Sequence, residues 1–399
     1  RSGGKLISPA GTVIRGAADL TATPKLYAVI CVERGGMIEV NGTSSKPVVM
    51  TSNKAAGSRD RGDWGGLVLC GKAVNNQGLD AQLEGFNNVA VDNTLGKFGG
   101  SDDADNSGVV KYVRIEFAGL AFEPNKEVNS LTMGSVGSKT EIEGVQCSFG
   151  NDDAFEWFGG TVNCKKLIAY KTTDDDFDTD FGYRGMVQFG IAVKDTAYFD
   201  LSWNAPSGSS TSETFESDND AAGSGKLPLT SAVFSNITCV GPVPLDKTYN
   251  DLASVQKNAF RRGARIRRNS RLSVVNSVFM GYRNFIMFDG DSVLIAAGVK
   301  YSSLLSIKDV TLALADTHSK LNSFCLTSLE RVLELLCSNL HFSLFKSVVI
   351  INSSFNFCIF CLCLQLNTQK RSVIVIKKFK KIKNEIFYHS LFSLNFGCL

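Results

Sequence analysis

The segments NDDAFEWFGG (Asn151–Gly160) and TDDDFDTDFG (Thr173–Gly182) lie 22 residues apart and align without a gap. Two aspartates, one phenylalanine and the final glycine are identical in the two segments, and Glu156 aligns with Asp178. The residues before each segment, GVQCSFG and KLIAYKT, also share one apolar pattern. A repeat of this length is typical of one coil of a right-handed parallel β-helix, in which strands stack about 4.8 Å apart.

The rest of the first 300 residues has the same character. Further short apolar strands that end in small or turn-forming residues are Val109–Gly119, Phe234–Gly241 and Ser273–Gly281. No segment between them keeps the 3.6-residue apolar period of a helix, and Val, Ile, Phe, Asn, Gly and Asp suit stacked strands with sharp corners. The sequence predicts an all-β, right-handed parallel β-helix. The alternative is a β-sandwich, which would place strands at intervals of about 8–12 residues without a repeated corner.

The chain of 399 residues divides into two unlike parts near residue 300. Of its 42 Lys and Arg and 39 Asp and Glu, 11 and 5 lie in residues 301–399, so residues 1–300 carry 31 positive and 34 negative charges, a net charge of −3. The last part has one glycine, no proline and six of the 11 cysteines. We therefore predict a β-helix domain over residues 1–300 and an unrelated tail, rich in Leu, Phe, Ser and Lys, over residues 301–399.

All three histidines, His318, His341 and His389, lie in that tail. The first 300 residues therefore exclude a Ser/His/Asp or Cys/His nucleophile system, His-ligated zinc and an imidazole base. Their five cysteines are widely spaced and odd in number, so we expect no disulfide framework. The chain starts at Arg1 without a charged and apolar leader, so we expect any signal peptide to have been removed or to lie outside this sequence.

Three interpretations of the tail stay open. Ser347–Leu366 has about the length that spans a bilayer, and the basic segment Lys370–Lys383 follows it, which suits a weak membrane anchor. Several Asn, Ser and Gln residues within this stretch speak against that interpretation. The other two interpretations are a mistranslated segment and an unusual packed extension. A membrane partner is expected only if the anchor is genuine.

Several long motifs in this chain resemble one known family. They are GTVIRG (Gly11–Gly16), KPVVMTSNKAAGSRDRGDWGGLVLCGKA (Lys46–Ala73), DNSGVVKYVRIEFAG (Asp105–Gly119), the repeat region Asn151–Gly185, ESDND (Glu216–Asp220) and RRNSRLSVVNSVFMGY (Arg267–Tyr282). Residues 11–290 are similar to secreted or surface-exposed right-handed β-helix proteins of Bacteroidetes, which often carry type IX secretion sorting domains or lipoprotein anchors. The resemblance implies a pectin-lyase-like solenoid in an extracellular or cell-surface setting, and it implies no settled activity.

The acidic repeat is the best candidate site. Strand alternation places the acids at even positions from Asp174 to Asp180 opposite the inward Phe177, so they face solvent, with Glu156 beneath Asp178. Stacked carboxylates repel each other by about 1 kcal/mol per pair in water, and Ca²⁺ would offset this repulsion because it prefers several oxygen ligands. We predict a Ca²⁺ site from the corner acids and a loop that folds back, made by Asp152, Asp174, Asp176, Asp178, Asp180, Glu216, Asp218 and Asp220.

Two alternatives to the calcium site stay open. The acids are solvated residues that cap corners through side-chain hydrogen bonds, or they are catalytic. The catalytic version rests on parallel β-helices that are pectate lyases or polygalacturonases, although the His-containing motifs of the polygalacturonases are missing here. Its acids, bases and cation would be Glu156, Asp174, Asp176, Asp178 and Arg184.

A run of six arginines between Arg261 and Arg271 is the other marked feature. Planar guanidinium groups match uronate or sulfate, so Arg265, Arg267 and Arg268 are candidate glycan ligands. Alternatively, these arginines pair with aspartates along the coil edge. Trp203, in a long polar loop, is a candidate platform for a sugar ring. Nucleic acid is not expected as a partner, because residues 1–300 are net acidic and contain no nucleic-acid motif.

The sequence thus favours an extracellular or cell-surface β-helix that binds a polysaccharide or mediates adhesion, with Ca²⁺ as the one cofactor considered. One alternative is a carbohydrate-active enzyme, either a lyase or a hydrolase, which we consider less favoured than binding. The other is a purely structural surface module. The oligomeric state is not predicted.

Overall fold

The computed structural model describes residues 1–290 apart from short gaps, and beyond residue 290 it describes the backbone of four strands. The gaps are residues 20, 23–25, 85, 87–93, 124–125, 202–209 and 245–246, and of 26–27, 121–123 and 126–127 only the backbone is described. The four strands are β26 (Ile307–Lys308), β27 (Thr311–Ala313), β28 (Lys346–Ser353) and β29 (Asn356–Cys363).

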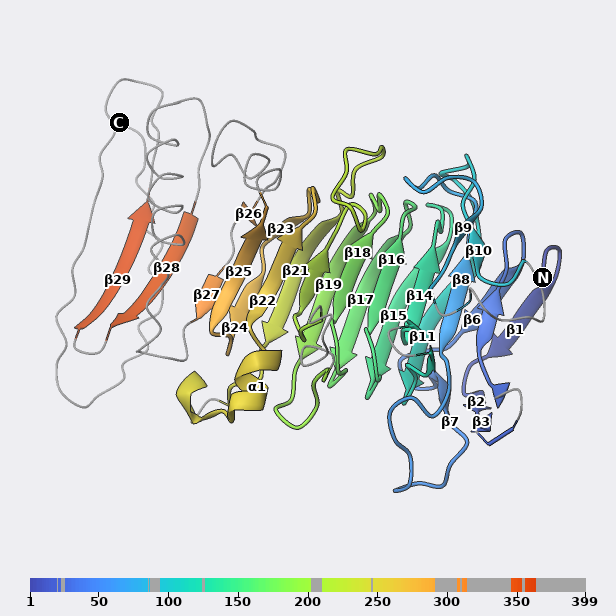
Figure 1. Cartoon of the computed structure of the whole chain (residues 1–399), viewed down its shortest axis with the longest axis horizontal. Coiled ribbons are helices and arrows are strands. Elements are labelled where there is room, and N and C mark those ends of the chain that lie inside the picture. The colour runs from blue at the N-terminus through green and yellow to red at the C-terminus, as the bar shows by residue number, and fades with distance from the viewer. Residues whose placement is uncertain are drawn as a thin grey trace, which may run out of the picture.

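Two parallel sheets run along the long axis of the molecule and form a solenoid (Figure 1). The smaller sheet has eight strands, and every neighbouring pair in it is parallel. In order of pairing its strands are β5 (Ile30–Val32), β8 (Leu67–Cys70), β14 (Leu131–Gly134), β16 (Phe155–Phe158), β18 (Phe177–Asp180), β20 (Phe215–Ser217), β22 (Arg262–Arg267) and β25 (Asn284–Asp289). We call it the eight-stranded sheet.

The larger sheet has thirteen strands, also all parallel. Its main path is β1 (Lys5–Pro9), β6 (Met37–Asn41), β11 (Gly108–Glu116), β15 (Glu141–Ser148), β17 (Asn163–Tyr170), β19 (Met186–Val193), β21 (Val233–Val240), β23 (Ser273–Val275) and β26. The strands β2 (Val13–Gly16), β7 (Val48–Ser52), β24 (Val278–Met280) and β27 pair beside that path. From β14 to β21 the chain passes alternately through one sheet and the other, so each pass through both sheets is one coil.

The long strands of the thirteen-stranded sheet bend at one equivalent position in successive coils. The bend residues have positive φ values between 49° and 70°; they are Tyr112, Gly144, Lys166, Phe189, Asn236 and Asn276. In some coils this bend separates two shorter strands. The long strand β21 then pairs with β23 before the bend and with β24 after it. Each coil therefore has three straight segments and three faces.

The interior is filled by side chains that stack from coil to coil. Phe155 pairs in register with Phe177, and their rings lie 5.7 Å apart at an interplanar angle of 17°. Phe215 continues the stack, with its ring centroid 5.4 Å from that of Phe177. The predicted 22-residue coil and its inward aromatic stack are therefore confirmed. Trp157 is also fully buried, so its ring is not available as a sugar platform.

The remaining elements are short. A 3₁₀ turn (Tyr249–Asp251) and the helix α1 (Ser254–Ala259) lie in the loop that leads into β22. Three antiparallel pairs decorate other loops: β3 (Ala18–Asp19) with β4 (Leu26–Tyr27), β9 (Ala81–Gln82) with β10 (Lys97–Phe98), and β12 (Ala121–Glu123) with β13 (Lys126–Glu127).

The strands described beyond residue 300 are of two kinds. β26 and β27 pair in parallel with β23 and β24, so the thirteen-stranded sheet continues past residue 300 to Ala313. β28 and β29 pair with each other in antiparallel fashion, within the stretch considered as a weak anchor. Among the described residues, no helix has the length and apolar character needed to cross a membrane.

Candidate functional site

Charged side chains form columns on the outer face of the eight-stranded sheet, because equivalent positions of successive coils stack in register. The strand column runs through β16, β18, β20 and β22, and its members are Glu156, Asp178, Glu216 and Arg265. Each member of the corner column lies two residues before an inward residue at or near the start of its strand. The members precede β14, β16, β18 and β20 or begin β22, and they are Asn129, Asp153, Asp175, Glu213 and Arg262. Both columns have acids on three successive coils and an arginine on the fourth.

The acids of three successive coils approach one another closely. Three groups of carboxylates each place one oxygen per residue within 4.8 Å of the others: Asp152, Asp153 and Asp174; Asp153, Glu156 and Asp178; and Asp175, Asp178 and Glu216. The register that set Glu156 beneath Asp178 is therefore confirmed. We call Asp153, Glu156 and Asp178 the acidic triad.

The acidic triad is poorly balanced by positive charge: among the described residues Arg267 lowers the pKa of Asp178, but by less than burial and the acids beside it raise that pKa. In the part of the chain that the structure describes, no Lys or Arg forms an ion pair with Asp153, Glu156 or Asp178. Glu156 accepts a hydrogen bond from the side-chain amide of Asn129, and Asp153 accepts one of 2.8 Å from the backbone N–H of Asp175. The Oδ1 atom of Asp178 is buried without a hydrogen-bond partner. An uncompensated buried oxygen of this kind is costly unless a cation or a donor reaches it.

Asn129 supplies a second buried oxygen at the same place. Its side chain is 1% exposed, and its Oδ1 atom has no hydrogen-bond partner, although its amide nitrogen touches Glu156. Amide and carboxylate oxygens are ligands that Ca²⁺ prefers, and the ion tolerates irregular geometry. The donor set around the triad is therefore all oxygen, includes two unpartnered buried oxygens, and fits a calcium ion.

Electrostatics in the triad disfavour ionised carboxylates when no cation is bound. Burial raises the pKa of Glu156 well above its usual range, and the neighbouring carboxylate of Asp178 raises it further. Burial likewise raises the pKa of Asp178, helped by Glu216, and that of Asp153, helped by Asp152. A nearby divalent cation would reverse this effect, because it stabilises the ionised form.

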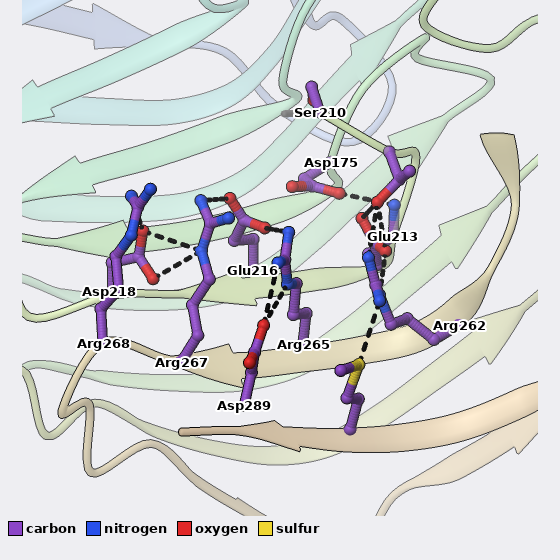
Figure 2. Close-up of polar contacts among 12 residues, drawn as sticks. Asp175, Ser210, Glu213, Glu216, Asp218, Arg262, Arg265, Arg267, Arg268 and Asp289 are labelled. Atoms are coloured by element: carbon purple, nitrogen blue, oxygen red, sulfur yellow. Dashed lines mark hydrogen bonds and ion pairs between the residues drawn. The ribbon is translucent and has the colours of Figure 1, made fainter. Parts of the chain in front are cut away.

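The arginines of the next coils neutralise the acids beside them (Figure 2). Arg262 donates from Nε to Glu213, and both side chains are almost fully buried. Arg265 contacts Asp289 at 2.9 Å and Glu216 at 3.6 Å. Arg267 donates to Asp218 at 2.8 Å and also to Glu216. We call these ion pairs, together with that between Arg268 and Asp218, the arginine ladder.

The candidate glycan ligands Arg265, Arg267 and Arg268 therefore all have carboxylate partners. Arg268 contacts Asp218 at 2.8 Å and is the most exposed of the three, at 39% of its side chain. The sequence left two roles open for these arginines, glycan binding and pairing with acids along the coil edge. The structure has the pairing with acids. Trp203 lies outside the described residues.

The prediction that Asp176 faces solvent is wrong. Its side chain is fully buried, accepts hydrogen bonds from the hydroxyls of Thr172 and Thr214, and lies 3.3 Å from the ammonium of Lys194, which is also fully buried. Alternation failed because β18 starts at Phe177, so Asp176 belongs to the corner, where a strand period does not apply. Within β18, Asp178 and Asp180 do lie outside while Phe177 and Thr179 lie inside.

The other predicted site residues lie outside the acidic triad. Asp218 pairs with arginines, and Asp220 caps a turn by accepting hydrogen bonds from the backbone of Ala222 and Ser224. Asp180 accepts a hydrogen bond from its neighbour Phe181. Asp174 accepts one from Ser210 and belongs to the group with Asp152 and Asp153.

Arg184 does not contact the acids with which the catalytic alternative grouped it. Its guanidinium contacts Asp103 at 3.0 Å and donates to the carbonyl of Gly182. Asp103 precedes β11 in the chain, so this pair ties two coils together.

Sequence reasoning missed three residues of the site: Asn129, Asp153 and Asp175. Asp153 and Asp175 were visible as identical residues of the repeat, but alternation was applied beyond the start of β18 and assigned Asp175 to the inner side. Asn129 is the equivalent residue one coil earlier. That coil is 24 residues long, as the pairing of Leu131 with Phe155 shows, so a fixed 22-residue offset could not find it.

Comparison with known proteins gives one match. The family model described as "Pectate-lyase like beta helix domain" matches residues 1–336 of the chain. No curated protein and no solved structure matches the chain. The matched range includes both columns and extends beyond residue 300, the end that the sequence predicted for the β-helix domain.

Proposed function

The chain belongs to the family of pectate-lyase-like β-helix domains, and on that premise we propose that it binds a polysaccharide outside the cell with the help of Ca²⁺. The family match indicates a polysaccharide-related function. The calcium, the binding role and the extracellular setting are our proposals. The lineage and the sorting domains that the sequence suggested stay predictions.

The observation that carries the proposal is the lack of a counter-ion at the acidic triad. Acids stacked on this face of the sheet differ in whether an arginine neutralises them. Glu213 and Glu216 form ion pairs with arginines. Asp153, Glu156 and Asp178 form none with the described residues. Two buried oxygens without donors, on Asn129 and Asp178, lie among these acids. An external cation with oxygen ligands would neutralise the triad and engage both oxygens.

A bound calcium would also turn this face into a binding surface. Without a cation, the acids would repel uronate or sulfate groups. When bound, the ion supplies positive charge with coordination positions for oxygens of a sugar chain. Asp153, Glu156, Asp178 and Asn129 would hold it. The straight face of stacked strands suits an extended polymer better than a compact ligand.

The enzyme alternative has weaker support than the binding role. Arg184, its proposed cation, is paired with Asp103, and Asp176, one of its proposed acids, is buried with Lys194. The triad oxygens lie within 4.8 Å of one another, which is too close for an inverting hydrolase, whose carboxyl groups lie about 6.5–9.5 Å apart, and near the separation of about 5–5.5 Å in retaining ones.

Retention of the full chain on immobilised polysaccharides tests the proposal. Polygalacturonate and a neutral glucan would each be used with calcium and with a chelator, and new chain ends would be measured in parallel. We expect calcium-dependent retention without new chain ends. Asp178→Asn should lose that retention, whereas Glu143→Gln, which removes the same charge from the other sheet, should keep it. Retention that ignores calcium would contradict the proposal, and new chain ends lost in Asp178→Asn would favour the enzyme.

A further inference from the structure

A second candidate binding site lies on the other sheet. A cavity of about 340 Å³ is lined by Ala56, Gly57, Arg59, Arg114, Glu116, Phe117 and Phe149. These residues come from the loop after β7, the end of β11 and the corners that follow β11 and β15. None of them belongs to the acidic triad or to the arginine ladder.

The carboxylate of Glu116, which lines this cavity, has hydrogen-bond donors within the protein. Glu116 is buried, and its Oε1 accepts from the guanidinium of Arg114 while its Oε2 accepts from the hydroxyl of Thr51 at 3.0 Å. Both carboxylate oxygens therefore have donors. Arg114 keeps 47% of its side chain exposed and has further N–H groups for a ligand.

Arg59 adds a positive charge that nothing in the described part of the chain neutralises. Its Nε donates to the backbone carbonyl of Lys54 at 3.1 Å, and Nη1 reaches the hydroxyl of Thr51 at 3.5 Å. It forms no ion pair with a described carboxylate. The lining therefore has two guanidinium groups and one carboxylate, and its net charge is positive. An anion with planar or branched oxygens is the ligand that such a pair of guanidinium groups would recognise.

Two aromatic rings form the apolar side of the cavity. Phe117 and Phe149 occupy the same corner of successive coils, and their rings are stacked with centroids 5.2 Å apart at an interplanar angle of 16°. Both have positive φ, 61° and 56°, which L-residues other than Asn and Asp rarely adopt. Tyr170 of the next coil continues the row, with its ring centroid 5.6 Å from that of Phe149. The row follows the helix axis, so it can contact successive units of a chain laid along that axis.

We infer that this cavity binds an anionic sugar unit of an extended polysaccharide. Arg59 and Arg114 receive its carboxylate or sulfate, and the rings of Phe117 and Phe149 contact the apolar face of the sugar. The inference rests on the proposed function for the class of ligand. It differs in mechanism, because the guanidinium groups bind the anion directly and no calcium takes part.

Calorimetric titration of the full chain in the presence of a chelator tests the inference. The probes are trigalacturonate, a sulfated trisaccharide and the neutral maltotriose. We expect binding of at least one anionic probe and much weaker binding of maltotriose. Arg59→Ala should weaken binding of the anionic probe by about tenfold to a hundredfold, the usual effect of losing a charged hydrogen bond. Whether the carboxylate or the sulfate probe binds more tightly identifies the anion.

Two further variants keep the inference falsifiable. Arg261→Ala is a matched control, because the Nε of that arginine also donates to a backbone carbonyl and the arginine forms no ion pair with a described carboxylate. It should bind like the parent protein. Phe149→Ala should weaken binding of all sugars that bind, and thermal melting should show that each variant is folded. Equal affinity of Arg59→Ala and the parent, or no preference for anionic over neutral probes, would overturn the inference.

Failure of this site and failure of the proposed function give different results. If the cavity is not a sugar site, binding in chelator is absent while calcium-dependent retention and its loss in Asp178→Asn persist. If the calcium proposal is wrong, chelator-resistant binding that depends on Arg59 persists while calcium has no effect.

Discussion

The acidic triad and the arginine ladder lie on the same face of the same sheet, one or two coils apart, and they manage negative charge in opposite ways. Glu213, Glu216 and Asp218 each contact an arginine. Among the described residues, Asp153 and Glu156 accept hydrogen bonds from neutral donors and form no ion pair. The β-helix thus repeats its backbone from coil to coil while its surface chemistry changes. The ladder neutralises its own charge, whereas on our proposal the triad takes its positive charge from a calcium ion.

The largest effect is expected from breaking the ladder. Arg267→Ala would leave Glu216 and Asp218 without their shared partner, and Arg267 has only 12% of its side chain exposed. Removal of one member of a buried ion pair typically costs about 3–5 kcal/mol, and we expect a loss toward the lower end because Arg265 still contacts Glu216 and Arg268 still contacts Asp218. Denaturant unfolding of the full chain measures this change. A loss below about 1 kcal/mol would show that the ladder does not stabilise the coils.

Calcium should stabilise the triad and leave the ladder unaffected. At a calcium concentration of about 100 times the Kd, binding to the folded state alone adds about 2.7 kcal/mol to the free energy of unfolding. Asp178→Asn should abolish that gain, and in chelator it should be at least as stable as the parent because it removes one of the repelling charges. Glu143→Gln serves as the control. A full calcium gain in Asp178→Asn would place the ion elsewhere.

In chelator, the pH dependence should run in the same direction for the triad and the ladder. Burial raises the pKa of Glu156 above its unfolded value, so its contribution to stability is complete below the unfolded pKa of about 4.3 and is lost as pH rises through the folded pKa. For Glu216, where burial outweighs Arg267, the folded pKa is about 7. The chelated protein should therefore melt at a higher temperature at pH 5 than at pH 8.

Added calcium should reverse much of this trend, because the ion favours the ionised acids. Glu156→Gln should flatten the chelated profile, since it removes one titrating group and keeps an oxygen for Asn129. Histidine titration does not complicate residues 1–300, which contain none. A chelated protein that is more stable at pH 8 than at pH 5 would contradict the assignment of raised pKa values to the triad.

The smallest effect is expected at the exposed end of the ladder. Arg268 has 39% of its side chain exposed and contacts only Asp218, which also has Arg267. Exposed ion pairs contribute about 0–1 kcal/mol, so Arg268→Ala should lie within that range in the same denaturant assay. A loss as large as that of Arg267→Ala would mean that the stabilisation by each ion pair of the ladder does not depend on the exposure of its arginine.

The repeat made part of this comparison predictable from the sequence. Two segments 22 residues apart set Phe155 over Phe177 and Glu156 beneath Asp178, because parallel strands in register preserve sequence offsets. The corner residues were harder to assign. Side-chain alternation holds only within a strand, so Asp176 turned inward to Lys194 before β18 began.

The ion pairs of the ladder could not be predicted from the sequence, because long loops separate the paired residues. Thr214 bonds to Asp176 across 38 residues, and Arg262 to Glu213 across 49, because long loops lie between these strands. No fixed period connects such partners, so the sequence showed a run of arginines without showing their acids. The cavity beside Phe117 and Phe149 was missed for a similar reason, since Arg59 reaches it from a loop whose path the sequence pattern did not determine.

Direct titration of Ca²⁺ into the chelator-treated full chain tests the central claim, that calcium supplies the counter-ion which no described Lys or Arg gives the triad. We predict saturable binding that disappears in both Asp178→Asn and Glu156→Gln and persists in Glu143→Gln. No saturable binding by the parent protein, or the same binding by Asp178→Asn, would contradict the account.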